Sequence, residues 1–263
     1  MKEMTKQKIG LSMLFCLGKP FSTLCQRLRS LTVQNVELVD EGWHSLSQER
    51  LQKLKEIGQS QNLSFTLHAP FAGINIAALS REMRAFAVKR LQKSIVFAQK
   101  LECHTMVFHP GVKTGINGFY PNLGWKLNIE SARVLLKLSE ELGVRIAIEN
   151  CPSKYMFLVS SVEEFSRFFD ELEGDLGLVL DVGHSNIEGT TYSLIKRFGE
   201  KIVHIHAHDN DGKQDLHLGV ECGTINWRKF ANSIKGSGFD GSVVVESYRN
   251  IDESVSKLQE LFA

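Results

Sequence analysis

The stretch IVHIHAHDNDGKQDLH, residues 202–217, holds four of the nine histidines of the chain and three aspartates. Its first part, IVHIHAHD, alternates apolar and polar residues with the period of two that is typical of a β-strand. Histidine and aspartate are rarely buried without partners. The stretch therefore predicts a strand whose end carries a cluster of imidazole and carboxylate groups.

Seven other runs are short, apolar and rich in strand-forming residues: KIGLSMLF (8–15), NVELVD (35–40), LSFTLHAP (63–70), HTMVFHPG (104–111), RIAIENCP (145–152), LGLVLDVGH (176–184) and SVVVESY (242–248). Amphipathic segments separate these runs. Residues 79–101 have apolar residues at three- and four-residue spacing, which predicts a helix. Residues 47–59 open with Ser47, a typical helix N-cap.

Strands that alternate with helices predict a parallel sheet. Eight such units in a chain of 263 residues fit a closed (β/α)₈ barrel better than an open sheet. An open doubly wound sheet would be expected to carry a G-x-G-x-x-G turn after its first strand, and FCLGKPF (15–21) does not match that pattern. We therefore expect residues 1–263 to form a single α/β domain, a TIM barrel with its active site at the C-terminal ends of the strands.

The composition narrows the function classes. The 31 Lys and Arg residues balance 30 Asp and Glu residues, which removes the usual electrostatic indication of nucleic-acid binding. No apolar run approaches the roughly 18 residues that span a bilayer, and MKEMTKQKIG lacks the apolar centre of a signal peptide. We expect a cytoplasmic protein with no membrane partner, whose five widely spaced cysteines are reduced thiols.

The predicted strand ends carry one set of residue types. Six strands and the segments after them supply nine His, Asp or Glu residues: His68, His109, Glu149, Asp181, His184, His206, Asp215, His217 and Glu246. The strand period places the residues two positions earlier on the same inward face, namely Thr66, Val107, Ala147, Val179, His204 and Val244. One register thus places the six strand-end candidates in a single upper layer of the barrel.

Carboxylates crowded into one buried layer repel each other unless protons or a cation offset their charge. Mixed imidazole and carboxylate ligands favour Zn²⁺, Mn²⁺ or Co²⁺ over Mg²⁺. The sequence therefore predicts a site for one to three divalent metal ions. His204 would lie one layer deeper as a supporting residue, and His208 and Asp209 would lie at the rim as supporting residues or substrate contacts.

The ordered motifs HAPF, FHPG, IEN, LDVGH, HIHAHDN, DLHLG and VVES resemble those of the xylose isomerase-like TIM-barrel superfamily. That superfamily includes sugar and sugar-phosphate isomerases and epimerases, and also the endonuclease IV family of abasic-site nucleases. The resemblance covers nearly the whole chain, from Ile9 to Tyr248.

The resemblance implies roles for individual residues. In the sugar epimerases, the positions of Glu149, Asp181, His206 and Glu246 bind the metal, the two glutamates also act as catalytic acid and base, and His184 contacts substrate. In the endonuclease IV pattern, three zinc ions would be held by three groups: His68, His109 and Glu149; Glu149, Asp181, His206 and Glu246; and His184, Asp215 and His217.

The departures from the nuclease pattern favour a sugar enzyme. DVGH replaces the nuclease's DTCH, and Leu216 replaces an arginine. In the region of the nuclease's basic loop after the second strand, Glu37, Asp40 and Glu41 would face DNA phosphates with the wrong sign. Phe71 fits either a DNA-inserting wedge or a packing residue, and we favour packing.

The same loop region suits a neutral polyol. Glu37 is a candidate for hydrogen bonds to substrate hydroxyls, and Trp43 is a candidate for stacking on a sugar face or for a lid. Asp209, after the seventh strand, is a further candidate substrate contact. The expected partner is a small sugar or sugar phosphate, and nucleic acid is disfavoured.

Two enzymatic hypotheses follow, and we favour the first. It is a metal-dependent sugar or sugar-phosphate isomerase or epimerase, in which Glu149 and Glu246 move protons through a metal-stabilised enediolate. The alternative is an endonuclease IV-like zinc phosphodiesterase, in which several ions activate water and stabilise the leaving oxygen. A third hypothesis is a barrel that binds metal or ligand without catalysis. The complete acid/base pair of Glu149 and Glu246 argues against it.

Overall fold

The computed structural model describes residues 8–263. Eight parallel strands pair in sequence order, and the first pairs with the last to close a barrel. The strands are β1 (Lys8–Ser12), β2 (Asn35–Val39), β3 (Ser64–His68), β4 (Met106–Phe108), β5 (Ile146–Glu149), β6 (Gly177–Asp181), β7 (Ile202–Ala207) and β8 (Ser242–Val245). The single (β/α)₈ barrel expected from the sequence is confirmed.

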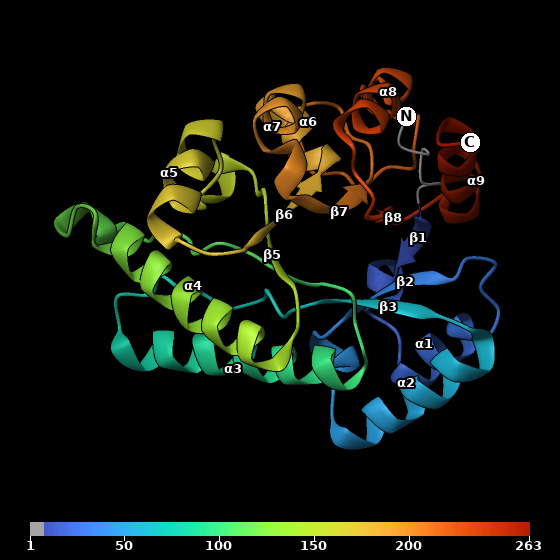
Figure 1. Cartoon of the computed structure of the whole chain (residues 1–263), viewed down its shortest axis with the longest axis horizontal. Coiled ribbons are helices and arrows are strands. Elements are labelled where there is room, and N and C mark those ends of the chain that lie inside the picture. The colour runs from blue at the N-terminus through green and yellow to red at the C-terminus, as the bar shows by residue number, and fades with distance from the viewer. Residues whose placement is uncertain (1–7) are drawn as a thin grey trace.

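Helices surround this barrel on its outside (Figure 1). The α-helices are α1 (Phe21–Leu28), α2 (Gln48–Gln61), α3 (Arg81–Lys100), α4 (Leu123–Leu142), α5 (Val162–Leu172), α6 (Val182–Glu188), α7 (Thr191–Phe198), α8 (Trp227–Ser237) and α9 (Ile251–Leu261). Five short 3₁₀ turns lie between these elements within the described residues: η1 (Met13–Cys16), η2 (Gly42–His44), η3 (Gly115–Phe119), η4 (Ser153–Tyr155) and η5 (Gly199–Lys201).

Local sequence signals explain where several helices begin. The side chain of Ser47 accepts a hydrogen bond from the backbone N–H of Arg50, as expected for the N-cap of α2. Ser161 and Glu164 form a reciprocal capping box at the start of α5. Strand β4 is shorter than its apolar run predicts, because Pro110 follows His109 and has no N–H for a sheet hydrogen bond.

Two apolar cores lie on the two faces of the sheet. A large cluster of leucine, isoleucine and aromatic residues fills the space between the strands and the helices. A separate small cluster contains Val107, Ala147 and Val179. These three residues were predicted to point into the barrel beneath His109, Glu149 and Asp181, and their separation from the outer core supports that register.

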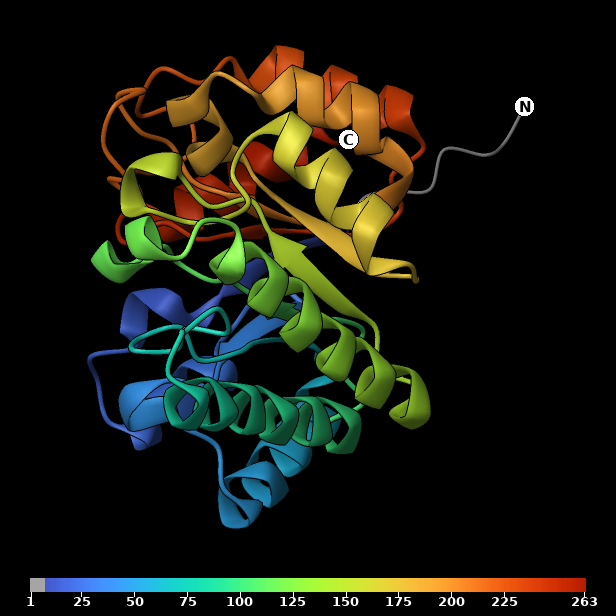
Figure 2. The same cartoon turned by 90° about the vertical axis from the view of Figure 1, so that its left-hand side faces the viewer.

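The loops that follow the strands gather at one end of the barrel, at left in Figure 2. The longest of them, residues 208–226, connects β7 to α8. The nine candidate metal ligands lie at or after the C-terminal ends of β3 to β8, the end of a TIM barrel at which active sites are found. None of the helices within residues 8–263 has both the length and the apolar composition needed to cross a membrane.

Candidate metal centre

Glu149, the last residue of β5, lies at the centre of one group of imidazoles and is buried. Its Oε2 atom is 3.2 Å from Nε2 of His68 and 3.1 Å from Nε2 of His109. Its Oε1 atom is 3.1 Å from Nδ1 of His184. Since β3, β4, β5 and β6 are consecutive neighbours in the barrel, their C-terminal ends, with the start of α6 after β6, bring these groups together.

A second group surrounds the Nδ1 atom of His206, on β7. This nitrogen is 3.6 Å from Oε2 of Glu149, 3.7 Å from Oδ2 of Asp181 and 3.6 Å from Oε2 of Glu246. Nδ1 of His206 is buried and has no hydrogen-bond partner. Three carboxylates and one unpartnered nitrogen thus converge on one buried position.

A third group contains His184, at the start of α6, and two residues of the loop after β7. Nε2 of His184 is 3.2 Å from Oδ2 of Asp215, and Nε2 of His217 is 3.5 Å from the same oxygen. Nδ1 of His217 lies 2.7 Å from the carbonyl oxygen of Glu246 and donates a hydrogen bond to it. The loop therefore folds back toward His184, as the sequence predicted.

The structure thus brings together all nine residues that the sequence singled out as metal ligands. Several subsets offer three or more ligand atoms within 4.8 Å of one another, among them His68 with His109 and Glu149, and Glu149 with Asp181 and His206. Metal binding by these side chains stays a prediction.

The two glutamates of the site have pKa values displaced in opposite directions. Burial alone would raise the pKa of Glu149, but the nearby His109 and His206 hold it well below its ordinary value. Burial raises the pKa of Glu246, and attraction to His206 and His217 only partly offsets that effect. Glu149 is therefore the more acidic of the two carboxyls.

The buried carboxylates also raise the pKa values of nearby imidazoles. Burial alone would lower the pKa of His206, but the charge of Glu246 contributes to a net pKa well above the ordinary value. Burial opposes the charged form of His217 in the same way, and its hydrogen bond with Asp215 helps to raise its pKa to about 9. The cluster therefore attracts positive charge, which protons or a metal cation can supply.

The sequence model of the xylose isomerase-like TIM barrel family matches residues 25–262, most of the described barrel. The chain belongs to this family. Among solved structures, a D-tagatose 3-epimerase-like protein superposes with a TM-score of 0.92 at 26% identity, covering 97% of both chains.

The relatives of the chain include proteins named as a sugar epimerase and as an endonuclease. The D-psicose 3-epimerase of Ruminiclostridium cellulolyticum is 22% identical over 211 residues, which cover 76% of this chain and 68% of the relative. The probable endonuclease 4 of Acholeplasma laidlawii is 24% identical over 217 residues, which cover 78% of this chain and 67% of the relative.

Glu37 does not lie in the loop region where the sequence analysis placed it. It is inside β2, fully buried, and its Oε2 atom is 3.1 Å from Nε2 of His204 and 3.0 Å from Nε2 of His206. Its carboxylate is therefore held beneath the metal layer, where it has no open face for a substrate hydroxyl. The signal was present in NVELV, because a charged residue in the middle of a buried strand needs an internal partner.

Asp209 was expected either to support the site or to contact substrate, and the contacts of its side chain are those of a supporting residue. Asp209 is fully buried, and its Oδ2 accepts a hydrogen bond of 2.8 Å from the indole Nε1 of Trp227. Its Oδ1 accepts bonds from the backbone N–H groups of Asn210 and Ile225. Both oxygens thus fasten the loop after β7 to the start of α8. Trp43, by contrast, lies in η2 with 64% of its surface exposed, and its contact with substrate stays a prediction.

The remaining acidic residues after β2 do not form a free negative surface either. Asp40 is fully buried in an ion pair with Arg90, 2.8 Å away. Glu41 accepts hydrogen bonds from the backbone N–H groups of Phe71 and Ala72. The expected repulsion of DNA phosphates by these charges is therefore not supported. Phe71 stacks on the ring of His109, with 5.5 Å between centroids, as the packing interpretation predicted.

His208 is the residue whose role the sequence analysis left open at the rim. It is fully buried, and its Nε2 atom lies 3.1 Å from Oδ1 of Asp181. Its ring stacks on that of His217, with 4.0 Å between centroids and 17° between planes. His208 therefore contacts both Asp181 and His217, and it also belongs to a group with His184, Asp215 and His217 whose ligand atoms lie within 4.8 Å of one another.

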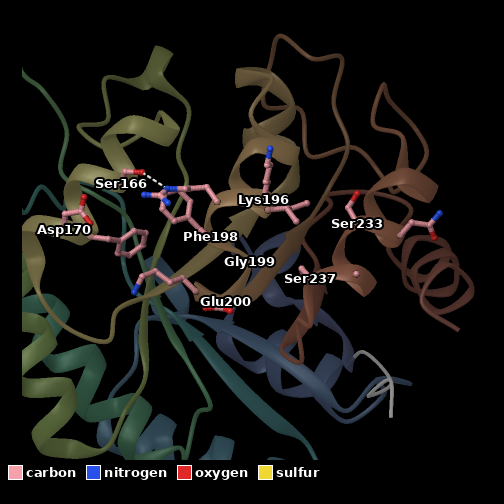
Figure 3. A pocket seen from close by; sticks show the side chains of 14 residues that line it. Ser166, Asp170, Lys196, Phe198, Gly199, Glu200, Ser233 and Ser237 are labelled. Carbon is pink, nitrogen blue, oxygen red and sulfur yellow. Dashed lines mark hydrogen bonds between the residues drawn. The ribbon is translucent and has the colours of Figure 1, made fainter. Parts of the chain in front are cut away.

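A cavity of about 670 Å³ lies elsewhere, between α5, α7 and α8 (Figure 3). Its lining includes both signs of charge, from Asp170 and Glu200 and from Lys196 and Lys201. Ser166 accepts a hydrogen bond from Arg197 across it. The nine candidate ligands are absent from its lining, so this cavity does not belong to the metal centre.

Proposed function

We propose that the chain is a divalent-metal-dependent isomerase or epimerase of a sugar or sugar phosphate. The observation that carries this proposal is the convergence of Glu149, Asp181 and Glu246 on the unpartnered Nδ1 of His206, at 3.6–3.7 Å. It combines a metal-ligand set with two glutamates that can exchange protons with a substrate.

The chemistry of the donors fits a cation. The Nδ1–H of His68 donates to the carbonyl of Ala69, 2.8 Å away, so the neutral ring turns the lone pair of its Nε2 toward Oε2 of Glu149. A lone pair and a carboxylate oxygen at 3.2 Å repel each other unless a proton or a metal ion lies between them. The mixture of nitrogen and oxygen donors suits Zn²⁺, Mn²⁺ or Co²⁺.

A bound ion would polarise a carbonyl group and its neighbouring hydroxyl. Glu149, with its lowered pKa, is ionised at neutral pH and so has a free carboxylate that can accept the proton on the carbon next to the carbonyl. Glu246, with its raised pKa, holds a proton more readily and can return one to the substrate. His184, beside Glu149, would orient a hydroxyl or an attached phosphate.

The similarity to known proteins supports the same class. A D-tagatose 3-epimerase-like protein matches nearly the whole barrel with a TM-score of 0.92. The chain itself has balanced charge, and Leu216 stands where the nuclease pattern has an arginine. These features favour a small neutral or singly phosphorylated substrate over a DNA duplex.

Phosphoester hydrolysis is the second candidate. It is favoured by the two additional groups, His68 with His109 and Glu149, and His184 with Asp215 and His217, because several ions can clamp an attacking and a leaving oxygen. The relative named as a probable endonuclease 4 points the same way.

The two candidates are separated by assaying one purified protein against both substrate classes. A panel of ketoses and sugar phosphates is incubated with Mn²⁺, Co²⁺ or Zn²⁺ in deuterium oxide, and products are read by NMR. An abasic-site DNA duplex is tested in parallel for incision. Stereochemical conversion or isomerisation with deuterium incorporated beside the carbonyl supports the proposal, and incision without sugar turnover supports the hydrolase.

A further inference from the structure

A buried carboxylate lies directly beneath the proposed metal layer. Glu37 is paired with Thr66 in the register of β2 and β3, and Thr66 is two residues below His68 on the inward face. Oε2 of Glu37 lies 3.0 Å from Nε2 of His206 and 3.1 Å from Nε2 of His204. These are ordinary N–H···O distances, so a single oxygen accepts two imidazole hydrogen bonds.

The contact fixes the roles of the two nitrogens of His206. An ionised carboxylate can only accept hydrogen bonds, so the nitrogen that faces it must carry a proton. With the proton on Nε2, the neutral ring has its lone pair on Nδ1. That atom faces Glu149, Asp181 and Glu246 and has no hydrogen-bond partner.

We propose that Glu37 is a positioning residue that selects the Nε2–H tautomer of His206 and so makes Nδ1 a metal ligand. This inference rests on the proposed metal-dependent function. The carboxylate also adds negative charge beneath the site and fixes the ring orientation, which strengthens an imidazole as a ligand. His204 contacts the same oxygen of this carboxylate and helps to hold it at His206.

Another use of these groups would be a separate ion held by Glu37, His204 and His206, whose ligand atoms lie within 4.8 Å of one another. For that, His206 would have to lose both ring protons and bind ions through both nitrogens. The two hydrogen bonds to Glu37 satisfy the same atoms without that cost.

The first test replaces Glu37 by glutamine, which keeps the shape and an accepting oxygen but removes the charge. Loss of such a partner typically weakens metal binding by roughly 10- to 100-fold, and we expect Glu37→Gln to fall in this range. Affinity is measured for Zn²⁺ and Co²⁺ by competition with a chromophoric chelator, so no knowledge of the sugar is needed.

Asp40→Asn is the matched control. Asp40 is also fully buried and lies just after β2, but its carboxylate pairs with Arg90. Only its backbone N–H, which the substitution keeps, contacts a candidate ligand, at the carbonyl oxygen of His68. We expect its metal affinity to match that of the wild type. Equal losses of metal affinity in Glu37→Gln and Asp40→Asn would show a general effect of removing a buried carboxylate. That result would overturn the proposed role of Glu37.

The second test needs no variant. Long-range ¹H–¹⁵N spectra of the Zn²⁺-loaded wild-type protein should show His206 bound through Nδ1 with its proton on Nε2. Binding through Nε2 would overturn the inference, as would unchanged affinity in Glu37→Gln or the loss of a whole ion from its metal content. A wild-type protein that binds no divalent metal would instead overturn the proposed function on which the inference rests.

Discussion

Gly183 leaves the space that the ring of His208 fills beside Asp181, because a Cβ atom at position 183 would overlap that ring. We expect Gly183→Ala to displace His208 and to lower the free energy of unfolding by about 1–3 kcal/mol, the usual cost of overpacking. Chemical denaturation of the metal-free protein measures this change.

Gly18 provides the control for Gly183→Ala. A Cβ atom there meets no atom within 4 Å, so Gly18→Ala should leave the stability nearly unchanged. Removing the ring in the double variant Gly183→Ala/His208→Ala should make the two changes non-additive. Strict additivity would show that the two residues do not compete for this space.

The metal-free protein should lose stability as the pH rises from about 6.5 to 9. The pKa of His217 is raised from 6.5 to about 9, so its contribution is fully present below pH 6.5 and is lost as the pH rises through 9. The raised pKa values of His184 and His206 act in the same direction. Urea unfolding in the presence of a chelator measures the trend.

At low pH the stability of the metal-free protein should change in the opposite direction, falling as the pH falls. The pKa of Asp215 is depressed below its ordinary 3.8, so its contribution is present above that pH and is lost as the pH falls further. Saturating Zn²⁺ should remove the loss of stability above pH 6.5, because the metal takes the place of the imidazole protons. A metal-free protein whose stability stayed constant or increased from pH 6.5 to 9 would contradict this electrostatic description.

Glu149→Gln and Glu246→Gln should each lower kcat by about 10²–10⁴-fold, since each removes a group that exchanges a proton with the substrate. Thermal unfolding of the two variants checks that the barrel remains folded. Full activity in Glu246→Gln would show that the site has been assigned to the wrong residues.

The number of bound ions should show which groups hold metal. The first is the quartet of Glu149, Asp181, His206 and Glu246, and the second is the outer group of His184, Asp215 and His217. We expect Asp181→Asn to lose the ion held with His206, whereas Asp215→Asn should leave the metal content unchanged. Elemental analysis after dialysis gives the content of both variants. If Asp215→Asn lost an ion that the wild type retains, the outer group would be a metal site and the hydrolase would gain support.

The sequence predicted the barrel because its signals are local and repeated. Eight apolar runs alternate with amphipathic segments, and every predicted run contains an observed strand. The nine strand-end and loop residues also came together as expected, because parallel strands of a closed barrel all deliver their C-terminal ends to one face.

The sequence is least informative about residues whose partners are distant in the chain. Glu37 meets His204 and His206 only after the barrel closes, and Asp209 meets Trp227 only after the β7–α8 loop has folded. The position of Glu37 inside an apolar run indicates that it needs an internal partner, but the sequence does not show that the partners are His204 and His206. For Asp209 the sequence left a supporting role and a substrate contact both open, because it does not show the contact with Trp227. The roles of such residues are set by tertiary contacts, which the periodicity of the sequence does not show.

The central claim is that this metal centre moves a proton beside a sugar carbonyl. Its most direct test is solvent deuterium exchange into a ketose panel by the metal-loaded protein, compared with the chelated protein and Glu149→Gln. The account predicts deuterium on the carbon next to the carbonyl of at least one sugar, with metal and Glu149 both required. Exchange into none of the sugars, together with metal-dependent incision of abasic-site DNA, would contradict it.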